Sequence, residues 1–252
     1  FIGKVSPDVL GEVFTHDIRA TGVAYDPPLV GLDAPGTARC MVLVTPDAQR
    51  TMNTYLGVSA LISPRDVSPE VVGAGKVVYC EGYLWDQPAA KEAIGKGMDL
   101  ARDAGAKVAF TLSDPFCVDR HRAEFLELAE HRVDILFANE AEITSLYETE
   151  NFDEAFQNAR ATGKLFAITR SEKGAVICQG AAVHLIDATP GVTVVDTTGA
   201  GDQFAAGFLY GVARGLGLAI SGRLGVLAAG EVISHIGPRP IVPLKELAAG
   251  LI

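Results

Sequence analysis

Short runs of β-branched residues alternate, from about Lys76 onward, with segments whose apolar residues recur at helical spacing. The first kind predicts strands over Val77–Tyr79, Lys107–Leu112, Ile135–Ala138, Leu165–Thr169 and Val192–Val195. The second kind predicts helices over Ala89–Ala104, Ala123–Arg132, Ala141–Tyr147, Asp153–Ala161, Gln203–Arg214 and Leu218 to about Ser234. Because strands that alternate with helices build a parallel sheet covered on both faces, the pattern predicts an α/β fold.

Two segments depart from this alternation. Ala175–Cys178 and Val183–Leu185 are joined by Gln179-Gly180, which predicts a hairpin near one edge of the sheet. Residues 22–55 hold several prolines and glycines around short β-type runs such as Arg39–Val44. This composition predicts a small antiparallel β unit that is separate from the alternating part of the chain.

Composition narrows the class of protein. The 252 residues are 48% hydrophobic and 21% charged, which supplies the core of one α/β domain. The net charge of -10 argues against a nucleic-acid or anionic-membrane partner. The four cysteines lack C-x-x-C spacing, so we expect buried free thiols rather than a zinc site or a disulfide framework. No apolar run approaches the roughly 20 residues of a membrane-spanning helix, and no signal peptide is visible.

Most of the residues that suggest a catalytic function lie between Val195 and Phe208. An apolar run leads into a turn of small residues, Gly199 to Gly201, and then into the predicted helix. The first N–H groups of such a helix are unpaired and attract anions such as phosphate. Asp202 stands beside this site, where it can accept a proton from an attacking hydroxyl. The alternative is an ordinary glycine-rich turn in which Asp202 is only a helix N-terminal acid.

The core of this run, D-T-T-G-A-G-D, is followed by Ala205, Ala206 and Gly207 and resembles the C-terminal signature of the PfkB (ribokinase-like) family of carbohydrate and nucleoside kinases. The resemblance implies a ribokinase-like three-layer α/β/α sandwich with a mostly parallel central sheet and a small β lid. It makes the chain, 1–252, one kinase domain with a lid insertion at about 22–55.

In that family the glycine-rich turn binds the transferring phosphoryl group and its last aspartate is the catalytic base. The resemblance therefore assigns these catalytic roles to Gly199, Ala200, Gly201 and Asp202. The opening of the chain, around Asp8 and Gly11, resembles a family segment that a strand and a Gly-Gly substrate-binding motif normally precede. It implies that the N-terminal part of the family domain lies outside the given sequence.

A second motif, Asn139-Glu140-Ala141-Glu142, follows a predicted strand and opens a helix. Its N-x-x-E spacing resembles the family motif that organises Mg²⁺ and the ATP phosphates, which implies that Asn139 and Glu142 bind this cofactor. Mg²⁺ takes oxygen ligands and usually keeps several waters, so an outer-shell role suits both side chains. As an alternative, Asn139 is a helix N-cap and Glu142 its capping-box partner.

Two further sites rest on the resemblance. At the end of another predicted strand, Thr169 and Ser171 match positions that contact the nucleotide phosphates, with Ser171 in place of a frequent glycine. The charged neighbours Arg170 and Lys173 are expected to be solvated loop residues.

Asp196 and Thr198 resemble a monovalent-cation site, which implies K⁺ with further ligands from backbone carbonyls near Ser234 to Gly237. Ile241 stands where some relatives supply a hydroxyl. Asp196 as a structural turn-former is the alternative.

Substrate contacts are predicted at Glu81 and Arg50. Glu81 ends a predicted strand, and relatives place an acidic or apolar residue there against the sugar. Arg50 follows a strand of the predicted lid and could reach a phosphate. Either residue is equally a solvated charge, and the lid itself equally a plain surface hairpin.

Together these features predict an ATP-dependent kinase that phosphorylates a hydroxymethyl group. Segments such as 50–57, 113–116 and 134–140 resemble adenosine kinases of the family, so adenosine is favoured and ribose or another sugar comes second. The predicted partners are ATP and a small nucleoside or sugar, in a cytoplasmic monomer or homodimer. A non-catalytic binding regulator would have little use for Asp202, and a Rossmann-type oxidoreductase needs a G-x-G-x-x-G motif that this sequence lacks.

Overall fold

The computed structural model describes residues 1–28, 30–31 and 33–251. The chain divides into two compact units. The first unit comprises Phe1–Leu43, Thr51–Gly75 and Leu84–Ala106, and the second comprises Val44–Arg50, Lys76–Tyr83 and Lys107–Ile252. Every residue that the sequence analysis assigned to a site belongs to the second unit.

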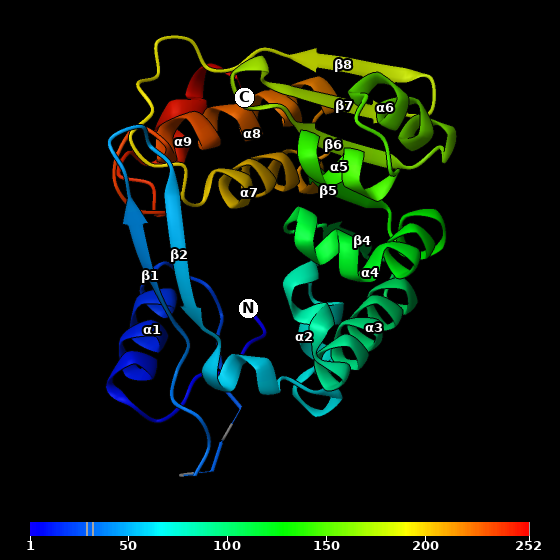
Figure 1. Cartoon of the computed structure of the whole chain (residues 1–252). Coiled ribbons are helices and arrows are strands. Elements are labelled where there is room, and N and C mark those ends of the chain that lie inside the picture. Colours follow the sequence, from blue (N-terminus) through cyan, green and yellow to red (C-terminus); the bar gives the residue numbers. More distant parts are fainter. Residues whose placement is uncertain (29, 32, 252) are drawn as a thin grey trace. The chain divides into compact units, whose positions relative to one another are not determined.

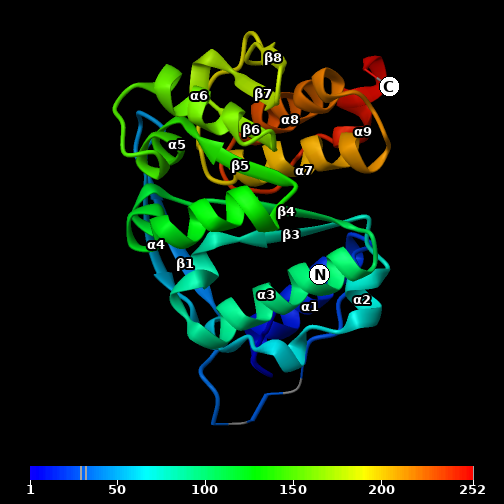
Figure 2. The same cartoon turned by 90° about the vertical axis from the view of Figure 1, so that its right-hand side faces the viewer.

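A six-stranded sheet forms the centre of the second unit, with its strands in the order of the sequence. These are β3 (Val77–Glu81), β4 (Lys107–Thr111), β5 (Ile135–Asn139), β6 (Leu165–Thr169), β7 (Ala175–Gln179) and β8 (Ala182–Ile186). The first four strands run parallel, and β7 and β8 are antiparallel to their neighbours. Figure 2 shows the strands stacked from β3 to β8. The mostly parallel sheet and its edge hairpin confirm the predicted fold class.

Helices cover both faces of this sheet (Figure 1). They are α7 (Ala200–Ala213) and α8 (Leu218–Val232) on one face, and α4 (Pro115–Glu127), α5 (Glu140–Leu146) and α6 (Phe152–Ala161) on the other. On the first face the ring of Phe137 lies 5.6 Å from that of Phe208. On the second, the rings of Phe110 and Phe125 are 5.2 Å apart. These buried aromatic contacts join the three layers through an apolar core.

The second helical layer begins earlier than the sequence suggested. The predicted start of the helix at Ala123–Arg132 is wrong, because the helix begins at Pro115. Asp114 caps it by accepting a hydrogen bond from the N–H of Cys117 at 2.6 Å. A proline fits there because its missing N–H would have no partner inside the helix. The last five residues of the predicted range form a π-helical turn, Leu128–Arg132.

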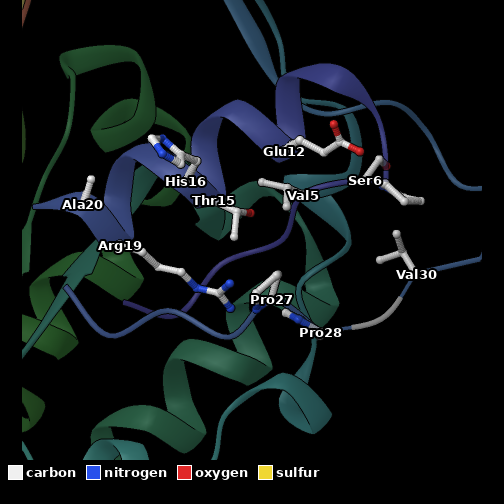
Figure 3. A pocket seen from close by; sticks show the side chains of 12 residues that line it. Val5, Ser6, Glu12, Thr15, His16, Arg19, Ala20, Pro27, Pro28 and Val30 are labelled. Carbon is white, nitrogen blue, oxygen red and sulfur yellow. The ribbon is translucent and has the colours of Figure 1, made fainter. Parts of the chain in front are cut away.

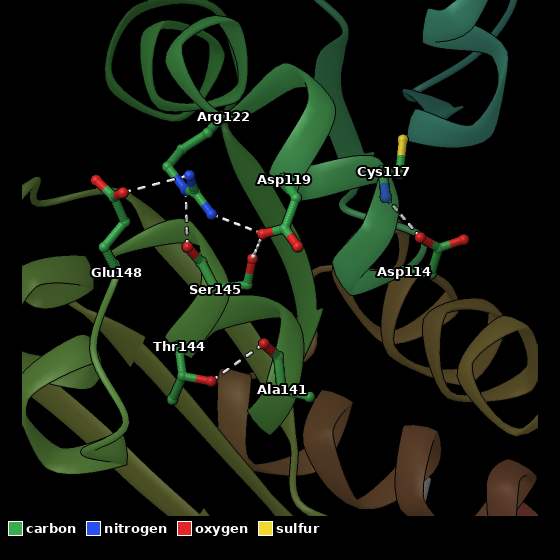
Figure 4. A network of polar contacts seen from close by, with 8 residues as sticks. All are labelled: Asp114, Cys117, Asp119, Arg122, Ala141, Thr144, Ser145 and Glu148. Atoms are coloured by element: carbon green, nitrogen blue, oxygen red, sulfur yellow. Dashed lines mark hydrogen bonds and ion pairs between the residues drawn. The ribbon is translucent and has the colours of Figure 1, made fainter.

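Arg122 ties α4 to α5 (Figure 4). Its guanidinium donates to the Asp119 carboxylate at 2.6 Å, to the backbone carbonyl of Ser145 at 3.0 Å and to Glu148 at 3.3 Å. The Ser145 hydroxyl also donates to Asp119. This network keeps α5, and hence the motif at its start, fixed against its neighbour.

The predicted strand Val192–Val195 is wrong: the segment pairs with no strand among the described residues. Instead, the N–H groups of Val195 and Asp196 donate to the carbonyl of Ile233, at 2.8 and 3.4 Å. That carbonyl lies just after α8, where helix carbonyls have no partner inside the helix. The end of the β-branched run therefore bonds to a helix end rather than to a sheet edge.

The first unit holds α1 (Val9–Ala20), α2 (Pro69–Gly73), α3 (Pro88–Asp103) and most of a two-stranded hairpin, β1 (Arg39–Val44) and β2 (Arg50–Tyr55). The hairpin confirms a small β unit within 22–55, although residues 22–38 add no further strand among those described. The sequence analysis missed α1, which Asp8 caps through the N–H of Gly11.

Shorter helical segments complete the chain: 3₁₀ turns over Gly57–Leu61, Pro64–Asp66, Gly82–Asp86, Ser171–Lys173 and Ala248–Gly250, and α9 (Leu244–Leu247). None of the helices in the described ranges combines the length and the apolar character that a bilayer crossing requires.

A pocket of about 730 Å³ lies in the first unit between α1 and the segment around Pro27 (Figure 3). Glu12, His16 and Arg19 line it along one face of α1, and Arg19 donates to the carbonyl of Tyr25 at 2.8 Å. No residue that the sequence analysis assigned to a site is among its lining residues.

Candidate active site

Three predicted residues lie at the carboxyl edge of the central sheet. Glu81 ends β3, Asn139 ends β5 and Thr169 ends β6. In the strand register Glu81 faces Thr111, and Asn139 faces Thr169. Because ligands of open α/β sheets bind outside the carboxyl ends of the strands, the sequence placed these side chains at the edge where a site is expected.

The turn before α7 has a shape that requires glycine at one position. Gly199 has a φ of +81°, in the left-handed region, and a Cβ there would lie 2.8 Å from the Cβ of Pro238. A side chain would therefore be both strained and blocked. At Gly201, in contrast, a Cβ would point into open space.

The turn presents unpaired donors. The N–H of Ala200 reaches the Thr197 carbonyl at 3.3 Å, and that of Gln203 reaches the Gly199 carbonyl at 2.9 Å. In the described part of the chain, nothing accepts a hydrogen bond from the N–H groups of Gly201 or Asp202. Free donors at the positive end of a helix dipole form an anion site.

Asp202 lies in the first turn of α7, with its side chain exposed. The protein around the carboxyl still removes part of its water, and this desolvation raises its pKa, while the positive charge of Arg50 works in the opposite direction. Arg50 is held at the turn because its guanidinium donates to the Thr197 hydroxyl at 2.6 Å. The structure thus brings Arg50 and Asp202 together at the glycine turn.

The charge of Asp202 also acts on a second carboxyl, that of Glu81. Desolvation raises the pKa of Glu81, and the Asp202 carboxylate raises it further. Sequence reasoning missed two tyrosines beside them. Burial raises the pKa of Tyr79, with Glu81 and Asp202 adding to the effect, and the hydroxyl of Tyr83 donates to the Ser113 carbonyl at 2.8 Å. The alternation Tyr79, Glu81 along a strand, which places both on one face, was the available signal.

Asn139 and Glu142 form the capping box that the sequence offered as an alternative. The Glu142 N–H donates to Asn139 Oδ1 at 2.8 Å, and Glu142 accepts from the backbone N–H and the side-chain amide of Asn139, at 3.0 and 2.6 Å. Glu142 is only 5% exposed, and burial raises its pKa to about 7. A buried carboxyl of this kind gains from a nearby cation, so the pair fits Mg²⁺ held through water.

Ser171 occupies a strained position after β6. Its φ of +51° lies in the left-handed region, which explains why a glycine suits this site. The expectation of a solvated Arg170 is wrong: its guanidinium pairs with Glu140 at 2.9 and 3.2 Å and stacks 3.6 Å above the Phe152 ring. Lys173 is exposed, and its Nζ lies 3.7 Å from Oε1 of Glu140.

Asp196 is 2% exposed and bonds within the chain. Its carboxylate accepts from the Thr198 N–H at 2.8 Å, the Thr198 hydroxyl at 2.6 Å and the Gly237 N–H at 2.9 Å. Burial opposes ionisation, but these hydrogen bonds outweigh it and hold the pKa below its usual value. The turn-forming role is confirmed. Across the described residues, no three His, Cys, Asp or Glu side chains gather as a metal site.

The model of the pfkB family of carbohydrate kinases matches residues 1–245, and the chain belongs to this family. A probable sugar kinase from Rhizobium etli is 52% identical, with a TM-score of 0.96 over 100% of this chain and 77% of that one. The adenosine kinase from Sinorhizobium meliloti is 51% identical, with a TM-score of 0.95 over 99% of this chain and 76% of that one. An uncharacterized sugar kinase from Archaeoglobus fulgidus is 26% identical over 96% of this chain and 94% of its own length.

Family membership establishes the class of reaction. The chain is a phosphotransferase of the sugar and nucleoside kinases, with an alcohol group as acceptor. The family uses ATP and usually Mg²⁺, and its acceptors are small molecules. The family resemblance, the fold class and the enzyme class predicted from the sequence are therefore confirmed.

Proposed function

We propose that this kinase transfers the γ-phosphoryl group of ATP to a hydroxymethyl group of a nucleoside, with adenosine as the favoured acceptor. The observation that carries the proposal is the open turn before α7: unpaired amides at Gly201 and Asp202 stand beside an exposed carboxylate. The unpaired amides of this turn suit a phosphoryl group, and the carboxylate beside them suits the proton of an alcohol.

Asp202 acts as the catalytic base. It orients the acceptor hydroxyl and takes its proton as the oxygen attacks phosphorus. The raised pKa makes the carboxylate a better proton acceptor, while the charge of Arg50 favours its ionised form. The Arg50 guanidinium donates a hydrogen bond to Thr197, next to the turn. It therefore also provides positive charge for the migrating phosphoryl group.

The nucleotide and ions are assigned to the neighbouring motifs. Gly199, Ala200 and Gly201 bind the γ-phosphoryl oxygens, and Thr169 and Ser171 contact the other phosphates. Bound Mg²⁺ neutralises phosphate charge, organised through Asn139 and Glu142. A K⁺ site at Asp196 and Thr198 is supported by the hydrogen bond from the Gly237 N–H to the Asp196 carboxylate, which holds the end of the 234–237 loop beside this side chain.

Support for adenosine comes from the Sinorhizobium meliloti adenosine kinase, at 51% identity. A sugar acceptor is the second candidate, because the Rhizobium etli protein of 52% identity is named a probable sugar kinase. In either case Glu81, beside Asp202 at the end of β3, is placed to accept a hydrogen bond from another hydroxyl of the acceptor.

A panel of acceptors in a coupled assay of ADP release decides between adenosine and a sugar as the acceptor. We expect kcat/KM for adenosine to exceed that for ribose, fructose and cytidine. A higher kcat/KM for a free sugar replaces the nucleoside assignment with the sugar one. Absence of ATP turnover with every acceptor favours a binding regulator and rejects the proposal.

A further inference from the structure

The loop that follows α8 supports the glycine turn from behind. The N–H of Gly237 donates to the Asp196 carboxylate at 2.9 Å. Pro238 lies against Gly199, at 2.8 Å from the position where a Cβ would stand. The loop at 233–242 therefore fixes both the entry to the turn and the glycine at its centre.

Glu231, near the end of α8, closes this loop. One carboxylate oxygen, Oε1, accepts from the backbone N–H of Ile241 at 2.8 Å and from that of Val242 at 2.9 Å. The same oxygen lies 3.3 Å from Nε2 of His235. The side chain of Glu231 thus joins the end of α8 to Ile241, ten residues further along the chain.

The position of Glu231 is costly for a carboxylate. Its side chain is 6% exposed, and Oε2 has no hydrogen-bond partner among the described residues. Burial raises the pKa, but the N–H groups of Val242 and Ile241, together with His235, outweigh it and keep the pKa below its usual value. A buried carboxylate loses its hydration, and the contacts that it organises have to offset this free-energy cost.

We propose that Glu231 is a positioning residue for phosphoryl transfer, holding the loop that fixes the anion turn at Gly199. The inference rests on the proposed function of that turn. Glu231 touches no reacting atom: it acts through the backbone of Ile241 and Val242, and then through Gly237 and Pro238.

Steady-state kinetics of the intact protein test this role. We expect Glu231→Ala to lower kcat by about tenfold or more while KM for the acceptor changes by less than about twofold, because the loss falls on the phosphoryl site. Glu231→Gln retains a carbonyl oxygen for both N–H groups, so its kcat should stay within about twofold of the wild type. Glu231→Asp, which is too short to reach both donors, should resemble the alanine variant and replaces it if that variant does not fold.

Glu246→Gln is the matched control, since Glu246 is exposed and its side chain lies outside the machinery described above. Its kcat should equal that of the wild type. An unchanged kcat in Glu231→Ala or Glu231→Asp overturns the positioning role, and so does a Glu231→Gln variant as impaired as they are. A wild type that turns over no acceptor defeats the proposed function, and this inference with it.

Discussion

Asp202 stands between opposing electrostatic influences. Desolvation raises the pKa of its carboxyl, and Arg50 lowers it. The Asp202 carboxylate in turn raises the pKa of Glu81. A base with a raised pKa accepts a proton more readily, and the nearby guanidinium limits the rise by favouring the ionised form. At the scale of single residues, the electrostatics suit proton transfer from an alcohol.

Asp202→Asn should lower kcat by about 10³-fold, because an amide cannot take the proton of the acceptor. Its shape is unchanged, so ATP should bind with nearly wild-type affinity. Single-turnover kinetics and isothermal titration with ATP measure the two effects. A variant with full turnover would show that Asp202 is not the base.

The two glycines of the turn give a second prediction. Gly199→Ala forces a side chain into the left-handed region and against Pro238, so we expect a lower free energy of unfolding. Gly201→Ala places its methyl group in open space, where the phosphoryl group is proposed to bind, and should leave stability nearly unchanged while raising KM for ATP. Denaturant unfolding and kinetics of both variants test this contrast. Equal stability of the two would contradict the geometry of the turn.

Among the elements, α5 shows how one motif serves both structure and site. The capping box pairs Asn139 with Glu142, and the bridge from Arg170 to Glu140 joins the start of the same helix to the loop after β6. The motif at the end of β5 and the turn after β6 are therefore held together by side chains between them. A helix cap contributes about 1 kcal/mol, so the box also stabilises α5.

The pKa of Glu142 predicts a pH dependence of stability. In the folded chain the pKa is raised from 4.5 to about 7, so the folded state keeps a proton that the unfolded chain loses. The stabilisation from this group is present below about pH 4.5 and is lost as the pH rises to about 7. Glu142→Gln, which does not titrate, should lose this part of the slope in urea unfolding between those two values. Identical slopes in both proteins would mean that the pKa is not raised.

For the whole molecule, binding of nucleotide should stabilise the fold. A ligand that binds only the folded state at 100 times its Kd adds about 2.7 kcal/mol to the free energy of unfolding. We expect ATP with Mg²⁺ to raise Tm, and EDTA to remove most of the gain, because Mg²⁺ held near Asn139 and Glu142 would neutralise the charge of the phosphates. Differential scanning calorimetry with ATP alone, with ATP and Mg²⁺, and with EDTA added measures this. An unchanged Tm at millimolar ATP with Mg²⁺ would contradict the nucleotide site.

Several elements could be predicted because their causes are local. The run Leu165–Thr169 was predicted at its observed bounds, since a short apolar β-branched run has few other uses. The capping box at Asn139 follows from the identity and spacing of two residues. The sequence does not reveal the start of α4, because Phe116 and the charged residues of its first turns obscure the helical period.

The sequence by itself determined the alternation of strands and helices, the small residues of the turn at 199–201 and the acid beside them, because these depend on spacing and on residue type. Only the tertiary structure decided that Val195 and Asp196 bond to the end of α8, that Arg50 reaches Thr197, and that Glu231 closes the loop behind Gly199. These contacts join residues that are far apart in the chain or that have no periodic pattern. Their partners are fixed by packing, and no local preference reveals them.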